Sequence, residues 1–439
     1  SYFGRINLSY LDRYILNVTM RSDGSSRFAP SDRYGYFPSV SLGWNVSKES
    51  FWKFPQTDLK FRLSYGKTGN QDGIGNYAWQ PLMSGGINYG NNSGMAVTSM
   101  GNNKLTWETA DQYDFGFDLG FWNGKLNMIA DIYLKNTNNL LYSMPLHGTS
   151  GFTSITSNIG SMRNYGVEFS INGHLNIGKV NWTSSFNISH NKNKLTKLLG
   201  DDLLPIGSNR ALKVGEELGA FYLFQMDGLY QYDGEVPQPL YDLGVRAGDV
   251  KYHDADNNGI INDNDRVLTG SSNPDFFGGW NNTFKYKGFQ LDVFFTYMYG
   301  NDVYAEWAVT ATRPGYRMAI TEDVAKNRWT APGSSDKYPR AVNTLCGHNS
   351  KNSTRFLEDG SFIRLRSLTF SYTFPQVMLQ KICLKGLRLY VQGDNLLLFS
   401  KYSGWDPEVS KNMDPQYFGV DLYGVPPSRS VNFGINLSF

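Results

Sequence analysis

The sequence predicts an all-β fold, a transmembrane antiparallel β-barrel with long extracellular loops, on three observations. The last nine residues, 431–439, alternate apolar side chains with small or polar ones and end on Phe439. Aromatic residues make up 15% of the 439-residue chain although the mean hydropathy is −0.41. No stretch approaches the ~20 apolar residues that a membrane helix needs. Because successive side chains of a strand point to opposite faces, this combination is typical of a wall between lipid and a wet lumen.

Thirteen strands follow from the same alternation. In chain order they are expected at residues 2–10, 14–22, 36–47, 58–67, 108–121, 125–137, 162–175, 179–192, 275–286, 288–300, 361–374, 386–399 and 428–439. Within 108–121, for example, Tyr113 and Phe115 alternate with Asp114 and Gly116. Most polar faces carry Asn, Asp, Ser or Glu, which suits a hydrated lumen.

The connections between these strands alternate in length. Short turns are expected at 11–13, 122–124, 177–178 and 287–288, with medium ones near 48–57 and 375–385. The Asn123-Gly124 pair predicts a type I′ hairpin. Long segments span 68–107, 138–161, 193–274, 300–360 and 400–427. Short turns on one side and long loops on the other are the asymmetry of outer-membrane barrels, whose long loops face the cell exterior.

The odd strand count carries a prediction about the whole barrel. If the strand that ends at Phe439 runs toward the periplasm, the first predicted strand does so too, and these two would meet in parallel. Single-chain bacterial barrels close with antiparallel neighbours and an even number of strands. We therefore expect residues 1–439 to be the C-terminal portion of one barrel domain, with at least one further strand before Ser1.

Charge and cysteine content argue against several classes of protein. The net charge of +2 is close to neutral and gives no indication of nucleic-acid binding. Cys346 and Cys383 are too few for a disulfide framework and fall on opposite sides of the expected membrane, which predicts free thiols. No metalloprotease, serine-hydrolase or phosphate-loop pattern has the required spacing and context, so no enzyme is predicted.

Residues 254–265 carry the one motif with ligand chemistry. Oxygen-bearing side chains stand at positions 1, 3, 5, 9 and 12 of a twelve-residue calcium loop, and Gly259 occupies its sharp turn. The candidate ligands are Asp254, Asp256, Asn258, the Ile260 carbonyl, Asn262 and Asp265. Asp265 replaces the usual bidentate Glu and no amphipathic helices flank the loop, so a solvated turn rich in Asp and Asn is the alternative. We expect a structural Ca²⁺ that orders the longest loop.

Four tryptophans in the long segments are candidate substrate contacts: Trp79, Trp307, Trp329 and Trp405. Their faces are suited to stacking on sugar rings. The competing interpretation is that they pack inside the loops, and it is favoured because loops of this length need cores of their own.

Several sequence stretches, in order along the chain, resemble the SusC/RagA group of TonB-dependent outer-membrane transporters of Bacteroidetes. They include DGSSRF at 23–28, RYGYFPSV at 33–40, LTWET at 105–109, GAFY at 219–222, GDVKY at 248–252, FIRLR at 362–366 and YSGWDP at 402–407.

The resemblance implies a barrel of ~22 strands in a Gram-negative outer membrane, filled by an N-terminal plug that these residues do not include. It also implies energy from the TonB complex through a segment upstream, and a SusD-like surface lipoprotein as partner. The expected function is import of oligosaccharides. Three alternatives are open: a peptide importer of the same family, a passive porin of the same architecture and, more distantly, a soluble or surface β-rich binding protein.

Overall fold

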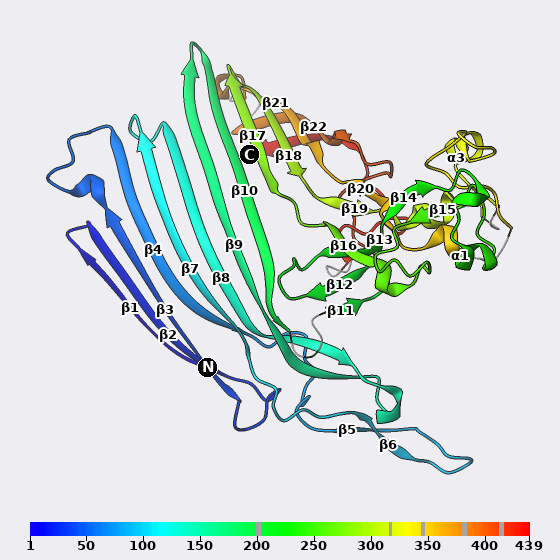
Figure 1. The fold of residues 1–439 in the computed structure, drawn as a ribbon. Coiled ribbons are helices and arrows are strands. Elements are labelled where there is room, and N and C mark those ends of the chain that lie inside the picture. The colour runs from blue at the N-terminus through cyan, green and yellow to red at the C-terminus, as the bar shows by residue number, and fades with distance from the viewer. Residues whose placement is uncertain (199, 201–202, 316–317, 344–346, 380–383, 412–416) are drawn as a thin grey trace. The chain divides into compact units, whose positions relative to one another are not determined.

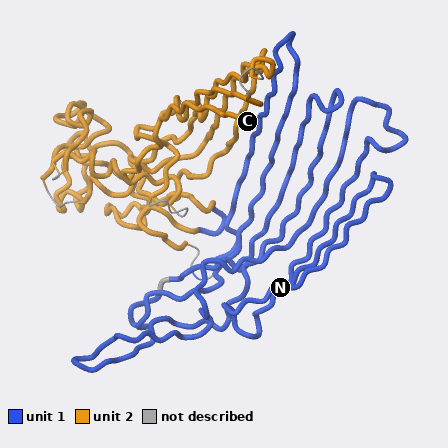
Figure 2. The backbone as a smooth tube through the Cα atoms, turned by 180° about the vertical axis from the view of Figure 1, so that it is seen from behind, with its two compact units in different colours: residues 1–202, 213–216 blue, residues 203–212, 217–439 orange. Residues whose placement is uncertain are grey.

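The computed structural model describes residues 1–439 except 199, 201–202, 316–317, 344–346, 380–383 and 412–416. The chain divides into two compact units, Ser1–Asp202 with Lys213–Glu216 and Leu203–Leu212 with Glu217–Phe439 (Figure 2). Among the described helices, none has the length and apolar character needed to span a membrane. Cys346 and Cys383, predicted to be free thiols, lie outside the described residues.

The first unit contains eight long strands, each paired antiparallel with the next (Figure 1). They are β1 (Tyr2–Tyr10), β2 (Tyr14–Gly24), β3 (Tyr34–Asn45), β4 (Thr57–Asn70), β7 (Glu108–Phe121), β8 (Leu126–Pro145), β9 (Ser154–Ile177) and β10 (Val180–Leu198). The register places Trp44 opposite both Tyr14 and Phe61, and Phe61 opposite Phe117. Such cross-strand pairs of large side chains stabilise each strand on its neighbour.

The second unit contributes five long strands, again paired antiparallel in sequence order. They are β17 (Phe276–Tyr286), β18 (Phe289–Tyr299), β21 (Phe362–Thr373), β22 (Gly386–Ser400) and β23 (Ser430–Ser438). In β23, Val431, Phe433, Ile435 and Leu437 present one exposed apolar face, as the alternation predicts. All thirteen predicted strands are therefore present among the described residues, and the all-β antiparallel fold is confirmed.

In the first unit, charged side chains that share one face of the strands pair with each other across neighbouring strands. Arg62 of β4 lies 2.9 Å from a carboxylate oxygen of Asp118 on β7 and 2.9 Å from one of Asp131 on β8. Sequence alternation assigns Asp118 to the polar face but does not identify this partner. An arginine shared by two carboxylates suits a face that contacts water rather than lipid.

Two predictions about connections are wrong. Segment 138–161, expected to be a long loop, is mostly a continuation of β8 and β9, and only residues 146–153 connect the two strands. The register shifts around Asn139, whose φ is 58°, and this bulge interrupts the alternation on which the prediction relied. The short turn expected at 122–124 is present, but its two central residues are Trp122 and Asn123 rather than the predicted Asn123-Gly124 pair. Trp122 and Asn123 have φ of 52° and 54°, and the Gly124 N–H donates to Phe121 O.

The long connections contain their own secondary structure. The small sheets are β5 (Leu82–Gly85) with β6 (Met95–Ser99), β11 (Leu203–Ile206) with β12 (Arg210–Lys213), β13 (Ala220–Phe224) and β16 (Arg266–Ser271), β14 (Met226–Leu229) with β15 (Val250–Tyr252), and β19 (Asp302–Tyr304) with β20 (Leu357–Asp359). The α-helices are α1 (Gln238–Asp242), α2 (Glu306–Ala311), α3 (Glu322–Asn327) and α4 (Gln376–Leu379). Single 3₁₀ turns are η1 (Val46–Lys48), η2 (Gly148–Ser150), η3 (Asp233–Glu235), η4 (Asp263–Asp265), η5 (Gly347–Ser350) and η6 (Thr354–Phe356).

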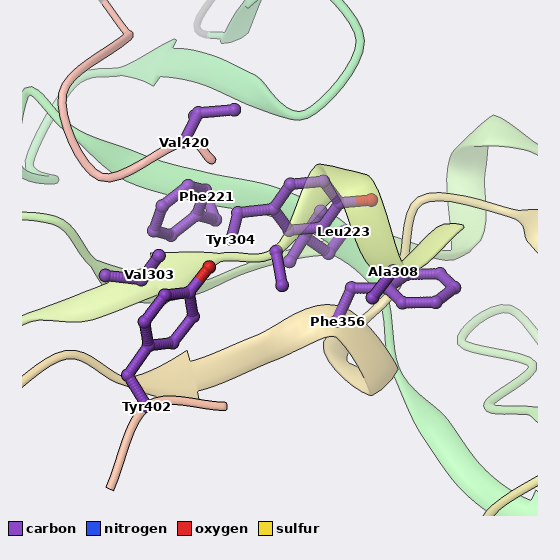
Figure 3. Close-up of a cluster of buried hydrophobic side chains, with 9 residues drawn as sticks. Phe221, Leu223, Val303, Tyr304, Ala308, Phe356, Tyr402 and Val420 are labelled. Atoms are coloured by element: carbon purple, nitrogen blue, oxygen red, sulfur yellow. The ribbon is translucent and has the colours of Figure 1, made fainter. Parts of the chain in front are cut away.

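Buried apolar clusters hold these connections together. In the first unit, Trp107 packs on Phe28 and Phe37 with ring centroids 5.0 and 5.5 Å apart. In the second unit, one cluster gathers side chains from β13, β19, α2 and η6 with two later residues (Figure 3): Phe221, Leu223, Val303, Tyr304, Ala305, Ala308, Phe356, Tyr402 and Val420. A separate cluster around Val245, Val250 and Tyr252 forms beside α1 and β15. Long loops with cores of their own can present side chains in fixed positions.

The alternation of turns and long connections predicts which residues face the cell exterior. In a background with both native cysteines changed to serine, Lys251→Cys and Lys326→Cys should react with an impermeant maleimide on intact cells. Lys125→Cys, in the turn between β7 and β8, should react only after the outer membrane is permeabilised. The reverse pattern of labelling would overturn the topology.

Candidate functional site

The predicted calcium loop lies in the second unit, between β15 and β16, and ends in the 3₁₀ turn η4. The structure brings three of its carboxylates together. One oxygen from each of Asp254, Asp256 and Asp265 lies within 4.8 Å of the others. Asp265 is fully buried, whereas Asp256 is exposed. Three oxygens of like charge converging at this distance form the type of donor set that a hard cation takes.

Backbone N–H groups of the loop point toward these carboxylates. Asp254 accepts from Gly259 N at 2.7 Å and Asn258 N at 3.2 Å, and Asp265 accepts from Ala255 N at 2.9 Å and Asn262 N at 2.8 Å. Desolvation acts to raise the pKa of Asp254, but these backbone hydrogen bonds outweigh it and lower that pKa. The same bonds also fit the alternative of an Asp- and Asn-rich turn.

The remaining predicted ligands stand beside the carboxylates and are engaged within the loop. The Asn258 amide oxygen accepts the Ile260 N–H at 2.8 Å, and its amide nitrogen donates to Asp256 at 2.8 Å. Asn262 caps η4 by accepting the Asn264 N–H at 2.9 Å. Among the side chains predicted as ligands, the two amides are hydrogen-bonded within the loop, and the three carboxylates converge.

The four candidate tryptophans separate into different roles. Trp329 packs against the Val245 cluster and donates its indole N–H to Gln231 at 3.1 Å, which is the loop-packing role. Trp79 is a partly buried residue of the first unit. Trp307 and Trp405, by contrast, line one pocket in the second unit. The sequence indicates all four as candidate contacts and favours packing inside the loops, and the structure places two of them in one pocket.

The pocket that Trp307 and Trp405 share has a volume of about 790 Å³. Tyr423 also lines it, from the connection between β22 and β23, and was not among the sequence candidates. Trp405 is 79% exposed and Tyr423 is 57% exposed, so two large aromatic faces are open to a ligand. Asp421 and Ser403 supply polar groups to the same pocket. We refer to this surface as the aromatic pocket.

Hydrogen bonds fix the inner wall of the aromatic pocket. The Trp307 indole N–H donates to the Tyr402 hydroxyl at 3.1 Å, and that hydroxyl donates to Asp421 at 2.7 Å. Burial, followed by the bond to Asp421, raises the pKa of Tyr402, so its proton stays in place at physiological pH. Trp307 is thus held by a chain of partners that ends at a buried carboxylate.

A buried ion pair anchors the segment that carries Trp405. Arg364 of β21 donates to Asp406 at 2.6 Å, and the two side chains are 3% and 5% exposed. Glu408 lies 3.0 Å from Arg364 Nε as an ion pair, although that nitrogen lacks hydrogen-bond alignment. Glu408 also pairs with Arg366 at 3.1 Å. Because Asp406 follows Trp405 directly, these contacts anchor the backbone next to the exposed indole.

Comparison with known proteins identifies the class. Residues 1–396 match the family described as "TonB dependent receptor-like, beta-barrel". "TonB-dependent receptor P3" of Formosa agariphila is 34% identical over the whole chain, which spans 45% of that protein. "TonB-dependent receptor SusC" of Bacteroides thetaiotaomicron is 31% identical over the whole chain, which spans 43% of that protein.

The solved structures agree. "Structure of the RagAB peptide transporter" is matched by the whole chain with a TM-score of 0.86 and 27% identity, and the chain covers 47% of that structure's chain. The chain therefore belongs to the TonB-dependent receptors of the SusC/RagA type, β-barrel proteins of the outer membrane. It spans about half the length of the curated relatives that it matches.

The Arg364–Asp406 pair predicts a sensitive anchor. Asp406→Asn leaves a buried guanidinium without its main counter-charge, which costs on the order of 3–5 kcal/mol when one partner of a buried pair is removed. Limited proteolysis of the full-length protein in detergent should show faster cleavage within 400–427. The matched control Glu322→Gln removes one partner of an exposed pair with Lys326 and should change cleavage little. Equal cleavage of the Asp406→Asn and parent proteins would contradict the anchoring role.

Proposed function

We propose that the full-length protein imports oligosaccharides across the outer membrane. The observation that carries this proposal is the aromatic pocket, in which Trp307, Trp405 and Tyr423 surround a volume of about 790 Å³. Aromatic side chains offer a large apolar face with few rotatable bonds, which matches the C–H faces of sugar rings. Asp421 and Ser403 add hydrogen-bonding groups at the same wall, as a ligand rich in hydroxyl groups requires.

Peptide import is the second candidate. It is favoured by the likeness to the structure described as the RagAB peptide transporter. The same aromatic faces also accept apolar side chains of a peptide. Sugar import ranks first because two exposed aromatic rings in one pocket provide repeated stacking surfaces.

Energy coupling and partners are part of the proposal. We propose that TonB drives transport through segments outside these 439 residues, and that a SusD-like surface lipoprotein covers the long loops. Membership in the TonB-dependent receptors supports the first statement, and the similarity to SusC and RagAB supports the second. A passive porin would transport without TonB. Loss of uptake in a strain without TonB would therefore support the energised importer, and unchanged uptake would support the porin.

The aromatic pocket makes a prediction about affinity. In the full-length protein purified with its partner, Trp405→Ala should weaken oligosaccharide binding by roughly tenfold, since about 1.4 kcal/mol corresponds to one decade and an aromatic contact is worth about that much. Isothermal titration with neutral tetrasaccharides and with tetrapeptides measures both ligand classes. Trp122→Ala, in the exposed turn after β7, is the matched control. If no saccharide binds and Trp405→Ala weakens tetrapeptide binding, the second candidate, peptide import, is favoured.

We further propose that the carboxylate trio Asp254, Asp256 and Asp265 holds a structural Ca²⁺. Like charges at this separation repel unless a cation screens them, so binding would close the loop. Without a bidentate glutamate the expected dissociation constant is ~10⁻⁴ to 10⁻³ M, the range of extracellular sites.

The calcium proposal predicts a protease phenotype. Asp254→Ala combined with Asp256→Ala should speed cleavage within 193–274 and reduce co-purification of the lipoprotein partner, with little change in barrel heat stability. Chelator should reproduce this effect in the parent protein, whereas Asp242→Ala, an exposed carboxylate outside the trio, should resemble the parent. Identical cleavage with calcium and with chelator would remove the proposal.

A further inference from the structure

A second hollow shares part of its lining with the aromatic pocket. Its volume is about 530 Å³, and it lies within the second unit. It shares Trp307, Thr321 and Ser403 with the aromatic pocket, so one indole borders both spaces. Its charged lining residues come from four parts of the chain: Asp323 on α3, Lys337 further on, Arg355 and Glu358 on η6 and β20, and Lys401 after β22. We refer to this space as the charged hollow.

The two carboxylates of the charged hollow are already satisfied by neutral donors. Asp323 accepts from the Tyr338 hydroxyl at 2.6 Å and from the Asn327 amide at 2.6 Å. The Tyr338 and Asn327 hydrogen bonds lower the pKa of Asp323, so it stays ionised. Glu358 accepts from Ser403 N at 2.8 Å and from Ser403 Oγ at 2.7 Å. Both carboxylates therefore hold neighbouring segments in place through these hydrogen bonds.

The three cations of the hollow, Lys337, Arg355 and Lys401, differ in how far they are buried. Arg355 is partly buried and donates to Thr312 O at 2.7 Å, Thr312 Oγ1 at 3.0 Å and Asn349 O at 3.1 Å, all of them neutral acceptors. Burial lowers the pKa of Arg355 to about 10, so it remains charged at neutral pH. Lys337 lies over the Tyr338 ring at 4.8 Å, and both lysines are exposed.

Positive charge is thus in excess where a ligand would enter. Within the described part of the chain, no carboxylate forms an ion pair with Lys337, Arg355 or Lys401. Three cations against two carboxylates leave the lining with one net positive charge. An anionic ligand would receive charge-assisted hydrogen bonds from these cations, and such bonds are stronger than those a neutral ligand would receive.

We propose that the charged hollow takes an anionic group, a carboxylate or a sulfate, of a substrate whose neighbouring ring or side chain contacts Trp307. This inference rests on the proposed import function and narrows its substrate class to acidic ligands. Lys337 and Lys401 provide mobile ammonium groups for the anion, and Arg355 fixes the positive potential behind them. The anionic group has two possible sources, an acidic sugar unit or the C-terminal carboxylate of a peptide.

The test measures charge selectivity in the full-length transporter purified with its partner. The probes are tetragalacturonate against a neutral hexose tetrasaccharide, and a tetrapeptide with a free carboxyl end against its amidated form. Lys337→Gln combined with Lys401→Gln should weaken the acidic probe roughly tenfold or more and leave the neutral probe unchanged. The conservative pair Lys337→Arg with Lys401→Arg should retain acidic binding, and added salt should weaken it in the parent. Lys326→Gln, an exposed lysine outside the hollow that pairs with Glu322, is the matched control.

Each outcome decides between the proposals. A loss confined to the acidic saccharide assigns the hollow to sugars, and a loss confined to the free-carboxyl peptide assigns it to peptides. Equal affinity for acidic and neutral probes in parent and variants overturns the charged hollow while the import function stands. If the parent binds none of the four probes, the import function fails and this inference fails with it. Heat-modifiable migration of each variant verifies that the barrel is folded.

Discussion

The fold depends on one constraint, that backbone N–H and C=O groups facing lipid must be paired by neighbouring strands. The hydrocarbon region holds no water to satisfy them. β7 illustrates the solution, since residues 108–121 pair along their whole length with β4 on one side and from Thr109 onward with β8 on the other. A shift of one residue in this register would move every apolar side chain to the wet face. Alternation of side chains is therefore strict along β7, whose register with both neighbours has no shift.

Outside the membrane this constraint is lifted, and other interactions take its place. The second unit gathers its connections around apolar clusters and around buried ion pairs. Asp249, which is 4% exposed, receives a two-pronged contact from Arg340 at 2.9 Å and a hydrogen bond from Asn349 at 2.8 Å. The buried pair of Arg364 and Asp406 anchors the segment that carries Trp405. Buried pairs of this type require matched partners, because leaving one charge alone is costly.

The sequence predicts most of the strands because alternation is local, and little of the site because its contacts are not. The errors have local causes: the bulge at Asn139 interrupts the alternation, and the left-handed turn begins at Trp122 rather than Asn123. The calcium-type spacing names Asp254, Asp256 and Asp265 within one contiguous loop, and their carboxylates lie within 4.8 Å of one another. Trp307 and Trp405, however, are brought together by partners far along the chain, such as Tyr402 and Arg364. No spacing rule indicates such pairs, so Trp329 could not be told apart from them.

The two spaces beside Trp307 act on a ligand through different physics. Stacking on an indole is tolerant, because many rings and apolar side chains present a suitable face. A group of cations is more selective, because a charged acceptor forms stronger hydrogen bonds with them than a neutral one does. Because Trp307 lines both spaces, different residues can set the affinity for a substrate and the selectivity for its charge. Substitutions at Lys337 and Lys401 can then change which substrates are accepted without disturbing the buried chain from Trp307 to Asp421, on which the pocket's shape depends.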